Sequence, residues 1–310
     1  MRVVFFGTPQ FAVPSLAALL DAGIEVAAVV TQPDRASGRS HSTLTPPPVK
    51  IFAERAGLPV WQPERPRGDL FLQQFRSADA ELGVVVAYGH LLPPELLAAP
   101  PLGLVNIHAS LLPRWRGAAP IQWAMLTGDA ETGVGVMRIE AGLDTGAVWL
   151  QRATPIDDND TAATLTDRLS SLGAEALLDA LPDIAAGVAP RPQDPAGATH
   201  ASKVDRALAR IRWDETARLV SCRIRAMDPH PGAWAVHRGV DIKLFGPKMV
   251  PSGNTSVDGP GMIESIDGNL VVRTTAGALQ IDQVQPAGRK RMPAREWLRG
   301  IELPPSSRFE

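Results

Sequence analysis

Short apolar runs alternate with helical patterns through the first part of the chain. Runs of valine, leucine and isoleucine that end at glycine or at polar residues are typical of buried strands. After Pro14, the spacing of Leu16, Leu19 and Leu20 predicts a helix. The predicted strands are Val3–Phe6, Val26–Val30, Leu82–Ala87, Leu104–Ile107, Val134–Ile139 and Ala147–Leu150, and the further predicted helices are Lys50–Ala56, Leu70–Arg76 and an amphipathic one through Leu165–Leu177.

This alternation of strands and helices predicts a Rossmann-like α/β domain with a doubly wound, mostly parallel sheet. Ligands of such sheets bind beyond the carboxyl ends of the strands. Tyr88-Gly89 follows one predicted strand, and Asn106 and His108 lie at the end of the next, so we expect a cleft there. The polar segment 31–48 is punctuated by proline and glycine, which predicts a long loop.

The pattern changes in the last part of the chain. Pro190, Pro192 and Pro195 predict a stiff linker, and Ala207–Ala226 has a helical pattern. Short apolar runs separated by turns then predict a small, OB-like antiparallel β-barrel. These runs are Ala233–Val236, Val240–Phe245, Gly261–Ile266, Leu270–Thr274 and Ala278–Val284. We therefore expect an α/β domain at 1–189, a linker at 190–206 and a β-barrel domain at 207–310.

Charge is divided unevenly between these parts. The whole chain has a net charge of −2, but residues 1–205 hold 15 Lys+Arg and 22 Asp+Glu, whereas residues 206–310 hold 16 and 11. A basic second part suggests a polyanionic partner, although basic clusters are most often solvated surface. The basic residues that could form a phosphate-binding face are Arg206, Arg210, Arg212, Arg223, Arg225, Lys243, Lys248, Arg289, Lys290 and Arg291.

The sequence carries few signals for disulfides, membranes or metals. Cys222 is the single cysteine, which excludes an intrachain disulfide and favours a cytoplasmic location. The first residues lead into a predicted strand without a charged leader, and no run of about 18 apolar residues predicts a membrane span. Six histidines without an H-E-x-x-H motif make zinc a poor interpretation. Gly7-Thr-Pro9 lacks the glycine fingerprint of NAD-dependent dehydrogenases.

Asn106, His108 and Asp144 are the strongest chemical candidates in the chain. An amide can donate a hydrogen bond to a developing oxyanion, an imidazole can move a proton, and a carboxylate can orient that imidazole. None of the three is a strong nucleophile, so the set favours direct group transfer over a covalent intermediate. Taken alone, Asp144 in Gly142-Leu-Asp-Thr-Gly146 is more typical of an ordinary turn, and a lone histidine is usually structural.

Two loops could bind a substrate near this set. The run Ser110-Leu-Leu-Pro-Arg-Trp-Arg-Gly117 combines an apolar surface with two guanidinium groups. Such a run suits a flat ring system, and it suits packing under the domain equally well. Arg35 and Arg39 in the long loop could hold an anionic substrate, or they could belong to a solvated loop.

Several motifs together resemble the folate-dependent formyltransferases, most closely those that act on methionyl-tRNA. The most specific are Asn106-x-His108-x-Ser-Leu-Leu-Pro-Arg-Trp-Arg-Gly-Ala-Ala-Pro-Ile121 and Thr31-Gln-Pro-Asp-Arg35, accompanied by Gly142-Leu-Asp-Thr-Gly146. The similarity covers nearly the whole chain, because it continues through Gly7-Thr-Pro9-x-Phe11-Ala12, Val85-Val-Ala-Tyr-Gly89, Gly128-Asp-Ala-Glu-Thr-Gly133, Ile224-Arg-Ala226, Pro231-Gly-Ala-Trp234 and Gln285-Pro-Ala-Gly288.

The resemblance implies a formyltransferase fold, a reaction and a set of site residues. The implied reaction transfers the formyl group of 10-formyltetrahydrofolate to the α-amino group of methionyl initiator tRNA, by direct amine attack through a tetrahedral intermediate and without a metal. The implied catalytic residues are Asn106, His108 and Asp144. The implied folate contacts are Tyr88, Leu91, Leu92, Ser110, Leu111, Leu112 and Pro113, and the expected tRNA contacts are Arg35, Arg39, Lys243, Arg289, Lys290 and Arg291.

Two further expectations concern assembly and tRNA binding. A monomer is expected. The loop after Arg39 reads Ser40-His-Ser-Thr43, where the family is often lysine-rich. We therefore expect this loop to attract the tRNA less strongly than its counterparts do.

Other functions are compatible with the same residues. The folate chemistry could act on another amine, such as a sugar nucleotide or a purine precursor, although the basic second part argues against that acceptor. Water could replace the amine, which would make the protein a 10-formyltetrahydrofolate hydrolase. A tRNA-binding module without activity is a third alternative, and the intact Asn106, His108 and Asp144 argue against it.

Overall fold

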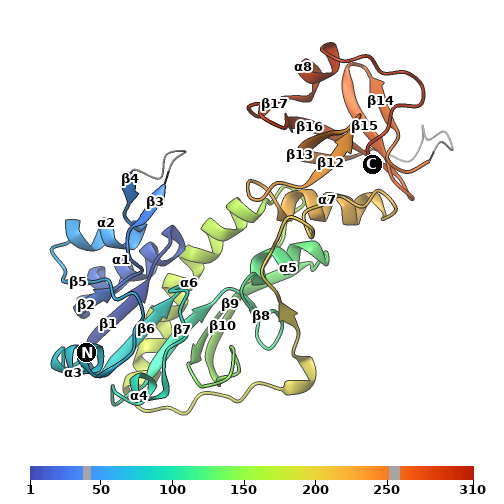
Figure 1. The fold of residues 1–310 in the computed structure, drawn as a ribbon. Coiled ribbons are helices and arrows are strands. Elements are labelled where there is room, and N and C mark those ends of the chain that lie inside the picture. Colours follow the sequence, from blue (N-terminus) through green and yellow to red (C-terminus); the bar gives the residue numbers. More distant parts are fainter. Residues whose placement is uncertain (38–42, 251–258) are drawn as a thin grey trace. The chain divides into compact units, whose positions relative to one another are not determined.

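The computed structural model of the chain describes residues 1–37, 43–250 and 259–310 (Figure 1). Contacts divide the chain into two compact units. The first unit consists of Met1–Gly117, Thr132–Thr154 and Thr166–Ala201, and the second of Ala118–Glu131, Pro155–Leu165 and Ser202–Glu310.

A mostly parallel sheet forms the centre of the first unit. Its strand order among the described residues is β10-β9-β7-β6-β1-β2-β5. The pairs β1·β2, β1·β6, β6·β7 and β2·β5 are parallel, and β7·β9 is antiparallel. The predicted α/β fold is thereby confirmed. The strands are β1 (Arg2–Gly7), β2 (Glu25–Val30), β5 (Val60–Trp61), β6 (Leu82–Val86), β7 (Leu104–His108), β9 (Glu131–Arg138) and β10 (Val148–Pro155).

The core strands form where the sequence is apolar on both faces. Residues 3–6 of β1 and 82–86 of β6 are all buried, as expected for parallel strands covered by helices. Helix α6 (Ala162–Ala185) approaches this sheet closely, because a Cβ at Gly173 would lie 2.9 Å from Ile107 Cγ2 of β7. The other helices of the unit are α1 (Val13–Asp21), α2 (Pro48–Arg55), α3 (Asp69–Ser77) and α4 (Pro94–Leu97), with a short 3-10 turn, η1 (Gln10–Ala12), before α1.

The predicted long loop at 31–48 contains a small hairpin. Strand β3 (Arg35–Ser37) pairs with β4 (Thr43–Thr45) in an antiparallel register that places Arg35 opposite Thr45. Three-residue strands are too short to show an alternating pattern, so sequence periodicity does not reveal them. The same reason applies to the two-residue strands β5, β8 (Arg116–Gly117), β11 (His200–Ala201) and β17 (Met292–Pro293). The helices that the sequence analysis does not predict are α4, α5 (Pro120–Leu126) and α8 (Ala294–Arg299).

The second unit contains an antiparallel sheet that is bridged into a barrel. The strand order is β12-β13-β16-β15-β14, and β17 pairs with β16. Residues 307–310 bond to both ends of this sheet: Ile263 N–H donates to Ser307 O at 2.9 Å, and Glu310 N–H donates to Val236 O at 2.8 Å. The predicted small β-barrel is confirmed. Its strands are β12 (Trp234–His237), β13 (Val240–Val250), β14 (Ile263–Ile266), β15 (Asn269–Arg273) and β16 (Ala278–Pro286).

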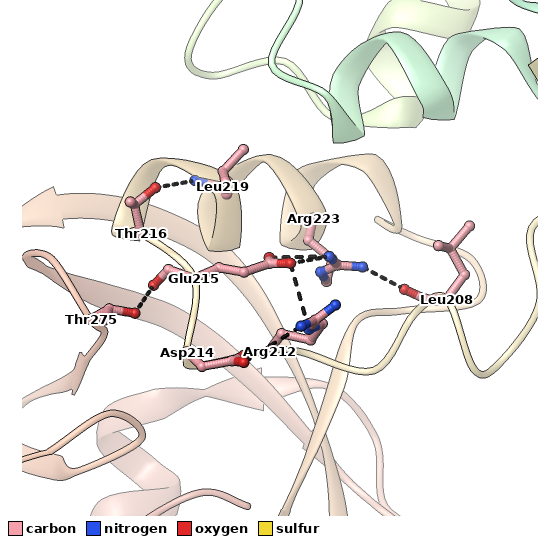
Figure 2. A network of polar contacts seen from close by, with 8 residues as sticks. All are labelled: Leu208, Arg212, Asp214, Glu215, Thr216, Leu219, Arg223 and Thr275. Atoms are coloured by element: carbon pink, nitrogen blue, oxygen red, sulfur yellow. Dashed lines mark hydrogen bonds and ion pairs between the residues drawn. The ribbon is translucent and has the colours of Figure 1, made fainter. Parts of the chain in front are cut away.

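Helix α7 (Ala217–Ala226) begins later than the sequence predicts. The prediction of a helix from Ala207 is wrong over residues 207–216, because this segment pairs with β12: Ile211 N–H donates to Trp234 O at 2.8 Å. Thr216 caps the helix by accepting from the N–H of Leu219 (Figure 2).

A polar network in the second unit secures the segment before α7. Arg223 of α7 donates to both carboxylate oxygens of Glu215, at 2.9 and 3.1 Å, and to Leu208 O at 2.9 Å (Figure 2). Arg212 also lies within ion-pair distance of Glu215. The charges of Arg212 and Arg223 are thus compensated inside the unit, which makes a structural role the simplest account of both. In the described parts of the chain, none of the helices has the length and apolar character needed to span a bilayer.

Candidate active site

Strand β7 brings Asn106 and His108 to the same face of the sheet. Successive side chains of a strand point to opposite faces, so residues two apart share one face. Both residues lie at the carboxyl end of β7, where the parallel neighbour β6 also ends. Asn106 is half-buried and His108 is 5% exposed, so an amide and an imidazole lie together in a largely water-excluded position.

The contacts of His108 fix the position of its proton. Its Nε2 lies 2.9 Å from the carbonyl oxygen of Trp115, which can only accept, so Nε2 must donate. The neutral ring therefore has its free lone pair on Nδ1. Nδ1 lies 3.8 Å from Oδ2 of Asp144, which is too long for a direct hydrogen bond but close enough for an ion pair when the ring is charged. His108 can thus gain a proton on the side that faces Asp144.

Asp144 is held in a tight, glycine-flanked loop. Its Oδ2 accepts from the N–H of Gly117 at 2.8 Å, and its backbone has φ +50°, which aspartate tolerates better than most residues. A Cβ at Gly146 would lie 1.9 Å from Arg138 O, so only glycine fits there. The turn interpretation and the catalytic interpretation of Asp144 are both compatible with this geometry, because the turn is what brings the carboxylate to His108.

The loop from Ser110 to Gly117 is packed and internally bonded. Ser110 is fully buried, and its hydroxyl donates to Arg114 O at 2.6 Å. Leu112 and Trp115 are also buried. The loop therefore has a fixed backbone, and the residues of 110–113 that stay partly exposed are Leu111 and Pro113.

Two residues of this site, Gln193 and Thr199, have no signal in the sequence. Gln193 donates to Asp144 O at 2.9 Å and to Gly146 O at 2.7 Å, and it accepts from the guanidinium of Arg116. Thr199 accepts from the N–H of Trp115 at 2.8 Å through its hydroxyl. Gln193 and Thr199 lie in the segment that the prolines predict to be a linker, and single polar residues among prolines carry no motif. Arg116 lies inside the Ser110–Gly117 loop, but the sequence does not reveal its partner in the fold.

The expected folate contacts beyond β6 differ in exposure. The Tyr88 side chain is buried against Phe6, with ring centroids 5.5 Å apart, and burial raises the pKa of its phenol to about 12. Its carbonyl oxygen accepts from Thr8 and from Gln32 at 3.1 and 2.8 Å. Leu91, in contrast, is 86% exposed, and Leu92 is partly buried against the core. Leu91 therefore offers an apolar side chain to a ligand. The buried ring and the carbonyl of Tyr88 instead fix the backbone at the end of β6.

A polar network anchors the base of the β3–β4 hairpin. Lys50 bonds both oxygens of Asp34 at 2.8 and 2.9 Å, and Gln62 donates to Asp34 at 2.7 Å. The Gln62 hydrogen bond, followed by the Lys50 contact, lowers the pKa of Asp34. Arg35 is exposed and donates to the side chain of Gln32. Arg39 lies outside the described residues.

The expected tRNA contacts of the second unit are not equivalent. Arg291 bonds Asp228 through two nitrogens, at 2.8 and 3.2 Å, and lies 3.8 Å above the ring of Phe245. Its charge is therefore already compensated. Arg289 and Lys290 are exposed in the turn before it, and Lys243 is partly exposed on β13. No ion pair is seen for these three in the described part of the second unit.

The described residues, 1–37, 43–250 and 259–310, contain no cluster of candidate metal ligands. Nowhere in these ranges do three or more His, Cys, Asp or Glu side chains gather as they would around a metal ion. Asp144 and His108 are the acidic and imidazole groups that approach one another at the end of β7, and they form a pair and not a metal cage.

Comparison with known proteins identifies relatives of both parts of the chain. Residues 1–181 match the family model described as "Formyl transferase", and residues 203–302 match "Formyl transferase, C-terminal domain". The methionyl-tRNA formyltransferase of Acidothermus cellulolyticus is 46% identical over 327 aligned positions and covers 100% of both chains. That of Parvibaculum lavamentivorans is 44% identical and covers 98% of each.

Solved structures share the fold at lower sequence identity. WlaRD, a sugar 3N-formyl transferase crystallised with dTDP and 5-N-formyl-THF, has a TM-score of 0.69 at 18% identity, covering 94% of this chain and 99% of that one. HypX from Aquifex aeolicus in complex with tetrahydrofolic acid has a TM-score of 0.64 at 19% identity, covering 96% of this chain and 47% of that one.

Proposed function

The chain belongs to the formyl transferase family, and we propose that it transfers the formyl group of 10-formyltetrahydrofolate to the α-amino group of methionyl initiator tRNA. It is an enzyme, and its product supplies translation initiation. One observation carries the proposal: Asn106 and His108 lie together at the end of β7 with Asp144 beside them, in a chain that aligns from end to end with proteins named for this reaction.

The residues beyond the carboxyl ends of β6 and β7 suit the folate on chemical grounds. Leu91 presents an exposed apolar side chain just beyond β6, and the buried loop at 110–113 adds a fixed backbone with polar main-chain groups. A pteridine-like ring needs both, because its faces are apolar and its edge carries hydrogen-bonding atoms. We assign folate contacts to Leu91, Leu92 and the 110–113 loop, and we assign Tyr88 a supporting role through its carbonyl and buried ring.

The role of Asn106 follows from the chemistry of its amide, and those of His108 and Asp144 also from their contacts. The folate supplies an electrophilic formyl carbon, which the amine of methionine attacks. Asn106 donates its amide N–H to the oxygen on which negative charge develops. His108 donates its Nε2–H to Trp115 O, so Nδ1 is the atom at which a proton is gained and released. Asp144 orients His108 and assists the movement of the proton from the amine to the leaving nitrogen.

The second unit supplies phosphate contacts for the tRNA. Lys243, Arg289 and Lys290 have no ion pair in the described part of that unit, so their charges can act on phosphates. Arg291 instead secures Asp228 and Phe245, and its role is structural. Arg35 and Arg39 are assigned to the acceptor end of the tRNA, with Arg35 oriented by Gln32.

The domain organisation, assembly and location follow the same proposal. Catalysis is assigned to residues 1–189 and tRNA binding to 207–310, with 190–206 between them. The enzyme acts as a monomer in the cytoplasm, where charged initiator tRNA meets the ribosome. Sedimentation equilibrium at micromolar concentration tests the monomer, and a dimer there contradicts it.

Formyl transfer with matched acceptors tests the function. The protein is mixed with formyl-labelled 10-formyltetrahydrofolate and one of four acceptors: methionyl initiator tRNA, methionyl elongator tRNA, free methionine or an amino-sugar nucleotide. We expect label on the initiator tRNA alone. Label on the sugar nucleotide supports the alternative amine acceptor, formate release without any acceptor supports a hydrolase, and tRNA binding without transfer supports an inactive module.

A further inference from the structure

The side chain of Gln193 joins the two loops that hold Asp144. Its Nε2 donates to Asp144 O at 2.9 Å and to Gly146 O at 2.7 Å. Its Oε1 accepts from Arg116 Nε at 3.0 Å and from a terminal nitrogen of the same guanidinium at 2.7 Å. The amide of Gln193 thus donates to the loop that contains Asp144 and accepts from Arg116 of strand β8.

Each half of this contact holds a neighbour of the Asp144 carboxylate. On one side Gln193 fixes the backbone of Asp144 itself. On the other side it fixes Arg116, whose neighbour Gly117 donates its N–H to Asp144 Oδ2 at 2.8 Å. The guanidinium of Arg116 belongs to a residue that is only 9% exposed, so a lost partner there would leave a buried charge.

The chain on either side of Gln193 is itself fixed to the first unit. Arg191 exchanges backbone hydrogen bonds with Val148 of β10, at 2.8 and 2.9 Å. Further along, β11 pairs with β8 in a parallel register, and a Cβ at Gly117 would lie 2.6 Å from Ala201 O. Gln193 is therefore held from both directions at a place where its amide can act on Asp144.

We propose that Gln193 is a positioning residue for the formyl transfer reaction: it sets the place of the Asp144 carboxylate relative to His108. The inference rests on the proposed function for its kinetic part only. Glutamine suits the position because one neutral side chain must donate to two carbonyl oxygens and accept from a guanidinium. Glutamate would keep the acceptor half but would face Asp144 O and Gly146 O without a donor.

Gln193→Glu removes the donor group of this side chain and keeps an acceptor for Arg116, whereas Gln193→Ala removes both the donor and the acceptor. Asp194→Ala is the matched control, because Asp194 lies next in the same segment and, among the described residues, its carboxylate accepts from the N–H of Ala196 and not from the loops around Asp144. We expect Gln193→Glu to lower kcat about tenfold, the equivalent of one lost hydrogen bond, while KM for both substrates changes by less than about twofold. Gln193→Ala should lower kcat at least as much, and the control should match the wild type.

Hydrogen exchange at the amide of Gly117 gives a readout that is independent of activity. In the wild type this amide is bonded to Asp144 Oδ2, so its exchange reports the place of the carboxylate. We expect faster exchange in Gln193→Glu, similar to that in Asp144→Ala, with a melting temperature close to that of the wild type. Asp194→Ala should leave the exchange rate unchanged.

The outcomes separate this inference from the proposed function. Unchanged exchange at Gly117 in both Gln193 variants overturns the positioning role, whatever the kinetics. A kcat within about twofold of the wild type in Gln193→Ala overturns it as well. If the wild type itself transfers no formyl group to methionyl-tRNA, the proposed function fails, and faster exchange in the variants still supports the positioning of Asp144 by Gln193.

Discussion

Phe309→Ala tests whether residues 307–310 close the barrel of the second unit. The Phe309 ring is 2% exposed. It stacks on Trp213, with centroids 5.7 Å apart and planes inclined by 18°, and on Trp297 at 6.0 Å and 14°. His237 contacts it edge-on at 5.7 Å. Phe309 therefore fills the centre of an aromatic cluster and is not a loose chain end.

The expected loss of stability is large. Truncation of a buried phenylalanine to alanine costs about 3–5 kcal/mol, and the two stacked contacts place Phe309 near the upper part of that range. For a domain of about 100 residues, 1 kcal/mol shifts the melting temperature by roughly 4–8 °C. We therefore expect the melting temperature of the second unit to fall by about 16–40 °C.

Calorimetry of the full chain measures this shift, and hydrogen exchange locates it. The amides of Ile263 and Val236 donate to Ser307 O and Glu310 O, so they should lose protection first in the variant. Met249→Ala is the control, because Met249 belongs to the same unit and is 57% exposed. A shift below about 5 °C, or equal shifts in variant and control, would refute the argument that Phe309 seals the barrel.

Four further predictions concern the site. Asn106→Ala should reduce turnover by about a hundredfold or more, since one oxyanion donor is worth roughly 3 kcal/mol, and near-normal single-turnover rates would exclude this role. Asp144→Asn, which keeps an acceptor for Gly117 N–H but loses the charge, should change the pH–rate profile; an unaltered profile contradicts a part in proton movement. The KM for tRNA should rise steeply with salt while that for folate barely changes, and parallel responses would argue against phosphate contacts. Tyr88 is the single tyrosine, and its tyrosinate absorbance should develop only near about pH 12, because burial disfavours the charged form; ionisation near its ordinary value of 10.0 would show that the ring is not buried.

The kinetic variants need one common control. Asn106→Ala and Asp144→Asn should melt close to the wild type, because Asn106 is half-buried and the asparagine at 144 can still accept from Gly117. A variant that melts much earlier would lose activity through unfolding. Its turnover would then be measured at a lower temperature, where both proteins are folded.

Local sequence determined the elements with long, uniform patterns. The strands of the parallel sheet are apolar throughout because they are covered on both faces, and such runs are legible without any partner. The same reasoning placed Asn106 and His108 on one face at a strand end, since alternation in a strand is a property of the backbone. The short apolar runs with turns likewise sufficed to predict the barrel.

Tertiary structure decided everything that depends on pairing between distant residues. Helix α7 begins at Ala217, after its cap Thr216, because the preceding segment forms backbone hydrogen bonds with β12, and helical spacing does not reveal this competing pairing. Tyr88 follows a strand as expected, yet its ring is buried against Phe6. Residues 307–310 have no strand pattern in the sequence, but they form backbone hydrogen bonds with β12 and β14, the two outer strands of the sheet.

The same division applies to the candidate site. The candidate side chains can be identified from the sequence alone, because an amide, an imidazole and a carboxylate are what group transfer to an amine requires. Only the fold decided that Asp144 reaches His108, and that Gln193, from a proline-rich segment, holds it there. The physical reason is that the type of a side chain is local, whereas its distance to a partner depends on the path of the whole chain between them.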